Sequence, residues 1–195
     1  MERRAGALYD SGVHPPTVVL ETSRLTLRRF TLDDAPFVHE MVNDPDWIRY
    51  IGDRGVHTLE DARVYIRDRT LAQYDRLGFG MYVVTLHGSD EALGTCGLIR
   101  RDGLDDVDLG FAFLARHRGR GYASEAAVAV LDQGVNGLGL KRIVAIVSPE
   151  NHRSIRILER IGMRFERMIR LPEDSDEIPL YAYEAPQYSR NASSG

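Results

Sequence analysis

The spacing of apolar residues predicts one strand and two helices in the first part of the chain. Leu25 and Leu27 alternate with polar residues, which predicts a strand with both leucines on one face. Thr31 precedes acidic residues and is suited to cap a helix. Thr58, with an aspartate three residues later, resembles a capping box and begins a second helix, which we expect to end at Gly78.

The middle of the chain has the pattern of consecutive strands. Short runs of apolar and β-branched residues alternate with brief polar turns, which predicts an antiparallel meander. The three runs cover residues 79–86, 92–101 and 106–114.

The second half predicts two further helices, each followed by strands. Apolar residues recur at three- and four-residue steps over 123–135, which predicts an amphipathic helix. The continuous branched run at 142–148 predicts a strand covered on both faces. A short helix is expected over 151–163, terminated by Gly162. Two closing strands are expected at 164–171 and 178–184.

Length and composition fit a single domain. A chain of 195 residues, 43% hydrophobic and 28% charged, can bury one sizeable core. The element order β-α-α-β-β-β-α-β-α-β-β predicts a mixed α/β sheet. We expect the domain to occupy 18–185, with flexible polar tails over 1–17 and 186–195.

Charge and cysteine content limit which binding partners and which cellular compartment fit the sequence. The net charge of −4 provides no positive field to attract nucleic acid or anionic lipid. Cys96 is the only cysteine and lies in an apolar run, so we expect a buried, inert thiol. No segment has the length and apolarity of a signal peptide or membrane span, and the six histidines lack metal-ligand spacing. We expect a cytoplasmic protein without a metal, a membrane or a nucleic-acid partner.

The segment RHRGRGYASEA, residues 116–126, joins an apolar strand to the start of a predicted helix. Its glycines permit positive φ and leave no Cβ to obstruct a ligand. Free N–H groups at a helix start and nearby arginines favour an anion. The segment lacks the Gly-Lys-Ser/Thr ending of a P-loop and the third glycine of the dinucleotide fingerprint. It therefore predicts a phosphate site of another kind.

Residues 118–123, RGRGYA, resemble the acetyl-coenzyme A pyrophosphate loop of the GNAT superfamily of N-acetyltransferases, Q/R-x-x-G-x-G/A. The continuation GYASEA resembles the Rim-type subfamily, whose members acetylate the N-termini of ribosomal proteins. Residues 149–166 resemble the second cofactor segment of the superfamily, and 21–35 resemble the opening of the subfamily. The resemblance implies a single GNAT fold, with a mixed, mostly antiparallel sheet, helices on both faces and splayed central strands.

The resemblance also implies which residues bind acetyl-CoA, which would be a cosubstrate. Phe113 and Leu114 would bond the pantetheine arm through their backbone, and Asn151 would contact it from the end of the next strand. The backbone N–H groups of the loop would hold the pyrophosphate, and nearby arginine side chains could also reach the phosphates. The loop residues are Arg118, Gly119, Arg120, Gly121, Tyr122, Ala123 and Ser124.

The implied reaction is direct attack of an amine on the thioester while both substrates are bound. An ammonium must first lose a proton, and Asp108 is the candidate base; the alternative is a solvated aspartate at a strand start. Glu125 is a weaker candidate base, and its alternative is an acid stabilised by the helix dipole. The backbone N–H of Leu114 would stabilise the developing oxyanion.

Protonation of the departing thiolate would need a different side chain from the one that many family members use. Their tyrosine corresponds to Leu158 here, and the resemblance to Rim-type enzymes, through the Asn-x-x-Ser pattern, implies Ser154 as the acid instead. The alternative role of Ser154 is a hydrogen bond with local backbone at the helix start. Because of Leu158, a non-catalytic acyl-CoA sensor on the same fold stays open as a second function.

Trp47 and Tyr50 lie between the first two predicted helices. Family members use this region to shape the acceptor pocket, so the two aromatic residues are candidates for substrate contact; the alternative is local core packing. The acceptor itself is left open among a protein N-terminus, a small amine and an amino-sugar antibiotic. A monomer and a homodimer are both compatible with the sequence.

Overall fold

The computed structural model describes residues 17–172 and 176–186. The predicted tails therefore lie almost entirely outside the described residues. Within these ranges the strands are β1 (Val18–Glu21), β2 (Leu25–Arg28), β3 (Met81–Leu86), β4 (Ala92–Ile99), β5 (Val107–Phe113), β6 (Arg142–Ile146), β7 (Arg164–Ile169) and β8 (Ile178–Glu184). The α-helices are α1 (Ala35–Val42), α2 (Pro45–Tyr50), α3 (Leu59–Tyr65), α4 (Ala72–Leu77), α5 (Tyr122–Asp132) and α6 (His152–Arg160).

The strands form one sheet in the order β1-β2-β3-β4-β5-β6-β8-β7. The predicted meander is confirmed, because β3, β4 and β5 are antiparallel neighbours. Of the described strand pairs, only β5 and β6 run parallel. This is the mixed, mostly antiparallel sheet that the sequence predicts.

β5 and β6 pair only where they begin. Val107 lies opposite Ile143 and Asp108 opposite Val144, and no later residues of the two strands pair with each other. β5 nevertheless continues to Phe113, paired with β4 along its other edge. The two central strands therefore splay apart, and the far end of β5 has one edge without a neighbouring strand.

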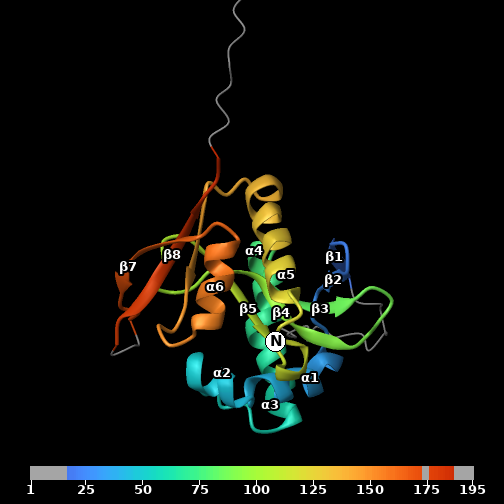
Figure 1. Cartoon of the computed structure of the whole chain (residues 1–195). Helices are drawn as coiled ribbons and strands as arrows, with labels where there is room; N and C mark the ends of the chain where they lie inside the picture. The colour runs from blue at the N-terminus through green and yellow to red at the C-terminus, as the bar shows by residue number, and fades with distance from the viewer. Residues whose placement is uncertain (1–16, 173–175, 187–195) are drawn as a thin grey trace, which may run out of the picture.

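Helices cover both faces of the sheet. Neighbouring residues of β3 point to opposite faces, and Val83 belongs to a cluster with α1 and α3, whereas Val84 belongs to the cluster that contains α5. α5 and α6 lie next to each other, while α1, α2 and α3 gather at one end of the molecule (Figure 1). No helix in the described ranges is long and apolar enough to cross a membrane.

The predicted helix boundaries are confirmed where the chain carries clear caps. Thr58 and Asp61 form a capping box at the start of α3. Gly78 ends α4 in the left-handed conformation, with φ of +77°. The segment between these helices, Ile66–Leu71, is π-helical, so the helical region is continuous from 59 to 77.

Two elements differ from the prediction. β1 is an additional edge strand paired with β2, and α2 is a short helix in the segment expected to connect two helices. Asp44 caps α2 by accepting a hydrogen bond from the Asp46 N–H at 2.9 Å, and Pro45 occupies the first turn. This cap and proline are a recognisable helix start, but six residues are too few to show an apolar period.

Candidate active site

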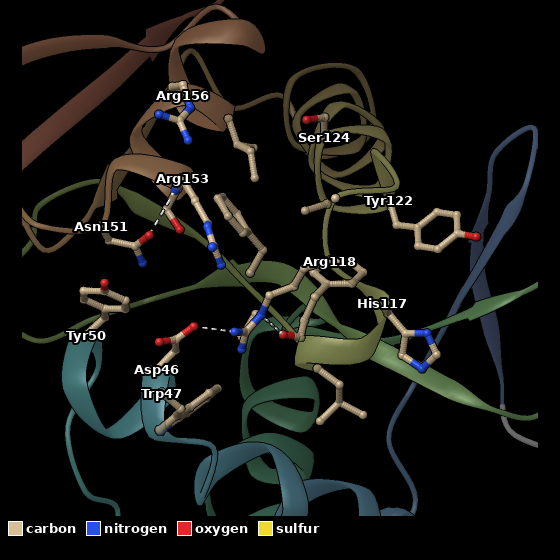
Figure 2. A pocket seen from close by; sticks show the side chains of 18 of the residues that line it. Asp46, Trp47, Tyr50, His117, Arg118, Tyr122, Ser124, Asn151, Arg153 and Arg156 are labelled. Atoms are coloured by element: carbon tan, nitrogen blue, oxygen red, sulfur yellow. Dashed lines mark hydrogen bonds and ion pairs between the residues drawn. The ribbon is translucent and has the colours of Figure 1, made fainter.

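A cavity of about 910 Å³ lies at the splayed end of β5. Its walls come from the end of β5, the loop to α5, the start of α6 and α2 (Figure 2). Among the predicted site residues, Asp108, Arg120 and the weaker candidate base Glu125 do not line it. The predicted residues that do are Trp47, Tyr50, Phe113, Leu114, Arg118, Gly119, Gly121, Tyr122, Ala123, Ser124, Asn151 and Ser154.

The loop between β5 and α5 presents a row of unpaired backbone N–H groups. Gly119 and Gly121 have φ of +79° and +81°. Within the described residues the N–H groups of 119–124 donate no hydrogen bond, and the first bond into the helix runs from the Glu125 N–H to the Gly121 carbonyl at 3.1 Å. Together with the dipole of α5, this row suits an anion. The Arg118 N–H lies outside the row because it donates to the Ala115 carbonyl.

Glu125 fixes the start of α5 to the β1–β2 turn. Its carboxylate accepts hydrogen bonds from the Thr22 hydroxyl at 2.6 Å and from Arg24 Nε at 2.7 Å. Arg24 also donates to the carbonyl of Arg120 at 3.2 Å. Partial burial acts to raise the pKa of Glu125, but the hydrogen bonds from Thr22, Arg24 and Ser23 outweigh it and hold this pKa below its usual value. Glu125 therefore anchors the loop as a carboxylate and, since it does not line the cavity, is poorly placed to act as a base.

α6 adds positive charge to one end of the cavity. Arg153, Arg156 and Arg160 are spaced three and four residues apart, so they share a face of the helix, and all three line the cavity. None of them forms an ion pair within the part of the chain that the structure describes. The sequence analysis did not single out these residues, although their spacing in HRSIRILER was a usable signal.

Asn151 and Ser154 meet at the start of α6. The Asn151 Oδ1 atom accepts a hydrogen bond from the Ser154 N–H at 3.1 Å and so caps the helix (Figure 2). The Ser154 hydroxyl makes no hydrogen bond within the described ranges, so the alternative bond to local backbone is not formed. Leu158, where family members carry tyrosine, is 1% exposed in the core and does not line the cavity.

The backbone of β5 corrects one predicted contact. The Leu114 N–H donates to the Leu93 carbonyl of β4 at 3.1 Å, and the Leu114 carbonyl accepts from the His117 N–H at 2.9 Å. In this structure Leu114 therefore has neither a free N–H for an oxyanion nor a free carbonyl for pantetheine. Because backbone groups alternate between the edges of a strand, those of Phe111 and Phe113 face the splay. Phe111, which the sequence analysis missed, lines the cavity.

Asp108 is buried at the last paired position of β5 and β6. Its side chain is 1% exposed, Oδ2 accepts a hydrogen bond from Arg101 Nε at 2.8 Å, and Oδ1 has no partner within the described residues. The alternative of a solvated aspartate is therefore wrong. Burial raises the pKa of Asp108 to about 6, against the opposing effect of Arg101.

This pKa predicts a pH-dependent cost to stability. The folded pKa of about 6 lies above the ordinary value of 3.8, so the folded state binds this proton more tightly than the unfolded chain does. The proton on Asp108 therefore contributes about 3 kcal/mol to the free energy of unfolding. This contribution is complete below pH 4 and is lost as the pH rises through 6. Urea denaturation at pH 4 and pH 8 should show that Asp108→Asn becomes more stable relative to wild type at the higher pH. Asp105→Asn, at an exposed site, is the control; equal pH dependence in wild type and Asp108→Asn would contradict the assignment.

Trp47 and Tyr50 reach the cavity from α2. Trp47 is half-buried and packs against the cluster formed by α1 and α3, and its indole N–H is buried without a partner among the described residues. Tyr50 extends from α2 toward Asn151 (Figure 2). Trp47 thus packs locally and also lines the cavity, and its contact with the substrate stays a prediction.

The end of the cavity at α2 also contains carboxylates, and these are paired. The Arg118 side chain extends toward α2, where it binds Asp46 (Figure 2). It also binds Asp44. Arg49 binds Glu150. No group of three His, Cys, Asp or Glu side chains within residues 17–172 and 176–186 is arranged to hold a metal ion.

Comparison with known proteins finds relatives that span most of the chain. A family model described as an acetyltransferase (GNAT) domain matches residues 24–164. The uncharacterized N-acetyltransferase YnaD of Bacillus subtilis is 31% identical over 84% of this chain and 94% of its own length. The crystal structure of a GNAT-family acetyltransferase from Bacillus anthracis matches with a TM-score of 0.70 and 31% identity, over 84% of this chain and 96% of that one.

A more distant solved structure contains the coenzyme. RimL, a ribosomal L7/L12 α-N-protein acetyltransferase in complex with coenzyme A, matches with a TM-score of 0.66 over 86% of this chain and 97% of that one. The identity of 16% makes this a likeness of fold.

Proposed function

The chain belongs to the GNAT family of acetyltransferases, and we propose that it transfers the acetyl group of acetyl-CoA to a primary amine. One observation carries the proposal. The unpaired N–H groups of 119–124 lie at the start of α5, on a cavity that continues along the free edge of β5. An anion site and an adjacent strand edge suit a ligand that joins a pyrophosphate to an amide-bearing arm.

The residues around the cavity fit acetyl-CoA. The N–H row would hold the pyrophosphate, and the arginines of α6 would neutralise further phosphate charge. The backbone of Phe111 and the N–H of Phe113 would bond the pantetheine amides along the splay, and the amide of Asn151 lies across the cavity. When bound, acetyl-CoA would supply a thioester whose carbonyl is open to attack by an amine.

The position of the single cysteine supports direct transfer between the two substrates. Cys96 is fully buried on β4, and burial raises the pKa of its thiol. A buried thiol of raised pKa is not a nucleophile. The protein therefore offers no cysteine that could carry the acetyl group as a covalent intermediate. In the proposed reaction the amine attacks while acetyl-CoA is bound.

Two side chains are proposed for proton transfer. The Ser154 hydroxyl, which has no hydrogen-bond partner in the described ranges, would donate to the departing sulfur. Asp108 has a pKa of about 6, suited to accept a proton near neutral pH. Because Asp108 does not line the cavity, its action as the base requires a water relay to the amine.

The acceptor would enter at the α2 end of the cavity, beside Trp47 and Tyr50. A protein N-terminus, which is the acceptor that the name of RimL gives for that protein, and a small amine are both compatible with this entrance. The buried Leu158 favours a second candidate function, a non-catalytic acyl-CoA sensor, because this position supplies no acid to the cavity.

Calorimetric titration tests the binding step that both functions share. We expect one coenzyme A per chain with a Kd of roughly 1 μM to 1 mM, the usual range of substrate affinities. The affinity should fall as salt is added, because phosphate contacts are screened. Pantetheine, which lacks the phosphates, is the control and should bind far more weakly. No heat on titration with coenzyme A would contradict the site assignment.

A further inference from the structure

α2 has little apolar packing to hold it in place. None of its six residues is buried, and Ile48 is 46% exposed. Trp47 is the one residue of this helix that packs against an apolar cluster. A helix this short is not stable alone, because nucleation costs more than so few hydrogen bonds return. Its position must therefore depend on contacts at its ends.

Ion pairs hold both ends of α2, but they differ in exposure. At the C-terminal end, Arg49 Nη2 lies 2.7 Å from Glu150 Oε2, and the two side chains are 61% and 66% exposed. Solvent screens such a pair, which contributes little. At the N-terminal end, Arg118 binds Asp44 and Asp46, and the side chains of Arg118 and Asp44 are only 27% and 16% exposed. The contact with Arg118 is therefore the stronger of the two.

The Arg118 guanidinium joins the cap of α2 to the end of β5. Its Nη2 atom donates to Asp44 Oδ1 at 3.0 Å, and this same oxygen accepts the capping bond from the Asp46 N–H. Its Nη1 atom binds Asp46, and its Nε atom donates to the carbonyl of Phe113 at 2.7 Å. Every guanidinium nitrogen is thus engaged between the helix and the strand (Figure 2).

We propose that Arg118 is a positioning residue that holds α2, with Trp47 and Tyr50, against the end of β5. That α2 borders the entrance for the acceptor rests on the proposed function, whereas the contact between Arg118 and α2 does not. Arg118 is then not a phosphate ligand, although it lies in the loop that the family uses for pyrophosphate. Its planar fork reaches a carbonyl and two carboxylates at once, which the single ammonium of a lysine cannot reproduce.

Fluorescence tests this proposal without an identified acceptor. Trp47 is the only tryptophan of the chain, so intrinsic emission reports on α2 directly. We expect Arg118→Gln to shift the emission to longer wavelength and to remove the protection of Trp47 from acrylamide quenching. Arg118→Lys should fall between this variant and wild type. With an amine that is accepted, Arg118→Gln should raise the KM for the amine while the Kd of coenzyme A stays the same.

Arg116→Gln is the matched control. Arg116 lies two residues earlier and pairs with Glu40 of α1, not with α2, so this variant should leave the emission unchanged. If Arg118→Gln does not fold, Asp46→Asn removes one arm of the contact from the opposite side and should also expose Trp47. Unchanged quenching in Arg118→Gln, or in Asp46→Asn where that variant replaces it, would overturn the proposal. A loss of coenzyme A affinity in Arg118→Gln, with the quenching of Trp47 unchanged, would also overturn the proposal. Failure of wild type to bind coenzyme A would instead contradict the proposed function and leave the fluorescence result standing.

Discussion

Replacing Gly121 by leucine is expected to weaken coenzyme A binding by roughly a factor of 100, equivalent to about 3 kcal/mol. Gly121 has φ of +81°, which costs an L-residue about 1–2 kcal/mol. A Cβ at this position would lie 3.4 Å from Arg24 Nη2, an ordinary van der Waals contact with the side chain that holds the Arg120 carbonyl, so backbone strain is the main effect. The loop can relieve this backbone strain only by moving, and movement would misalign the N–H row on which the pyrophosphate depends.

Gly139→Leu is the matched control for backbone strain. Gly139 has φ of +70°, and a Cβ there would meet no heavy atom within 4 Å. It lies in the connection between α5 and β6 and does not line the cavity. Both variants should therefore lose some thermal stability, but only Gly121→Leu should lose affinity in calorimetry. A folded Gly121→Leu protein that binds coenzyme A as wild type does would show that the anion site is elsewhere.

Removing the Ser154 hydroxyl is expected to lower turnover by roughly 10- to 100-fold, at the lower end of the usual effect of a general acid because a thiolate is a fair leaving group. The Kd of coenzyme A should stay close to wild type in Ser154→Ala. The hydroxyl has no hydrogen-bond partner in the described part of the chain, whereas the Ser154 backbone N–H, which binds Asn151, is retained in the variant. The helix cap is therefore kept in Ser154→Ala. A loss of turnover in this variant would reflect the chemical step and not the folding of the protein.

Two further variants make this result specific. Ser154→Thr keeps a hydroxyl and should recover much of the activity. Tyr50→Phe removes the hydroxyl that α2 brings to the cavity and tests whether it is the donor instead. Normal turnover in Ser154→Ala together with a large loss in Tyr50→Phe would transfer the role of acid to Tyr50.

The features predicted from the sequence depend on local signals. The capping box at Thr58, the terminating Gly78 and the glycines at 119 and 121 each fix backbone conformation within a few residues, and the structure has all of them. The splay of β5 and β6 followed from the family resemblance and not from any local pattern. β1 was missed because its residues, VVLE, do not alternate between apolar and polar, and α2 was missed because six residues are too short to display a helical period.

The corrections concern groups whose partners are distant in sequence. Arg118 and Asp46 are 72 positions apart, and no pattern along the chain reveals that they meet. Leu114 was predicted to offer its backbone to ligands, but the choice between it and Phe111 depends on which strand edge faces β4. Asp108 lies in a polar sequence context and is nevertheless buried, because β4 and β6 enclose it on the two sides.

Amine-dependent release of coenzyme A tests the central claim most directly. The protein is incubated with acetyl-CoA and a panel of N-terminal peptides and small amines, and the free thiol and the acetylated amine are both quantified. We predict that at least one amine raises thiol release above the rate of thioester hydrolysis, with one acetylated amine formed per thiol and with much slower release by Gly121→Leu at subsaturating acetyl-CoA. Tight binding of acetyl-CoA with no amine-dependent release across the panel would contradict the transferase account and support the acyl-CoA sensor.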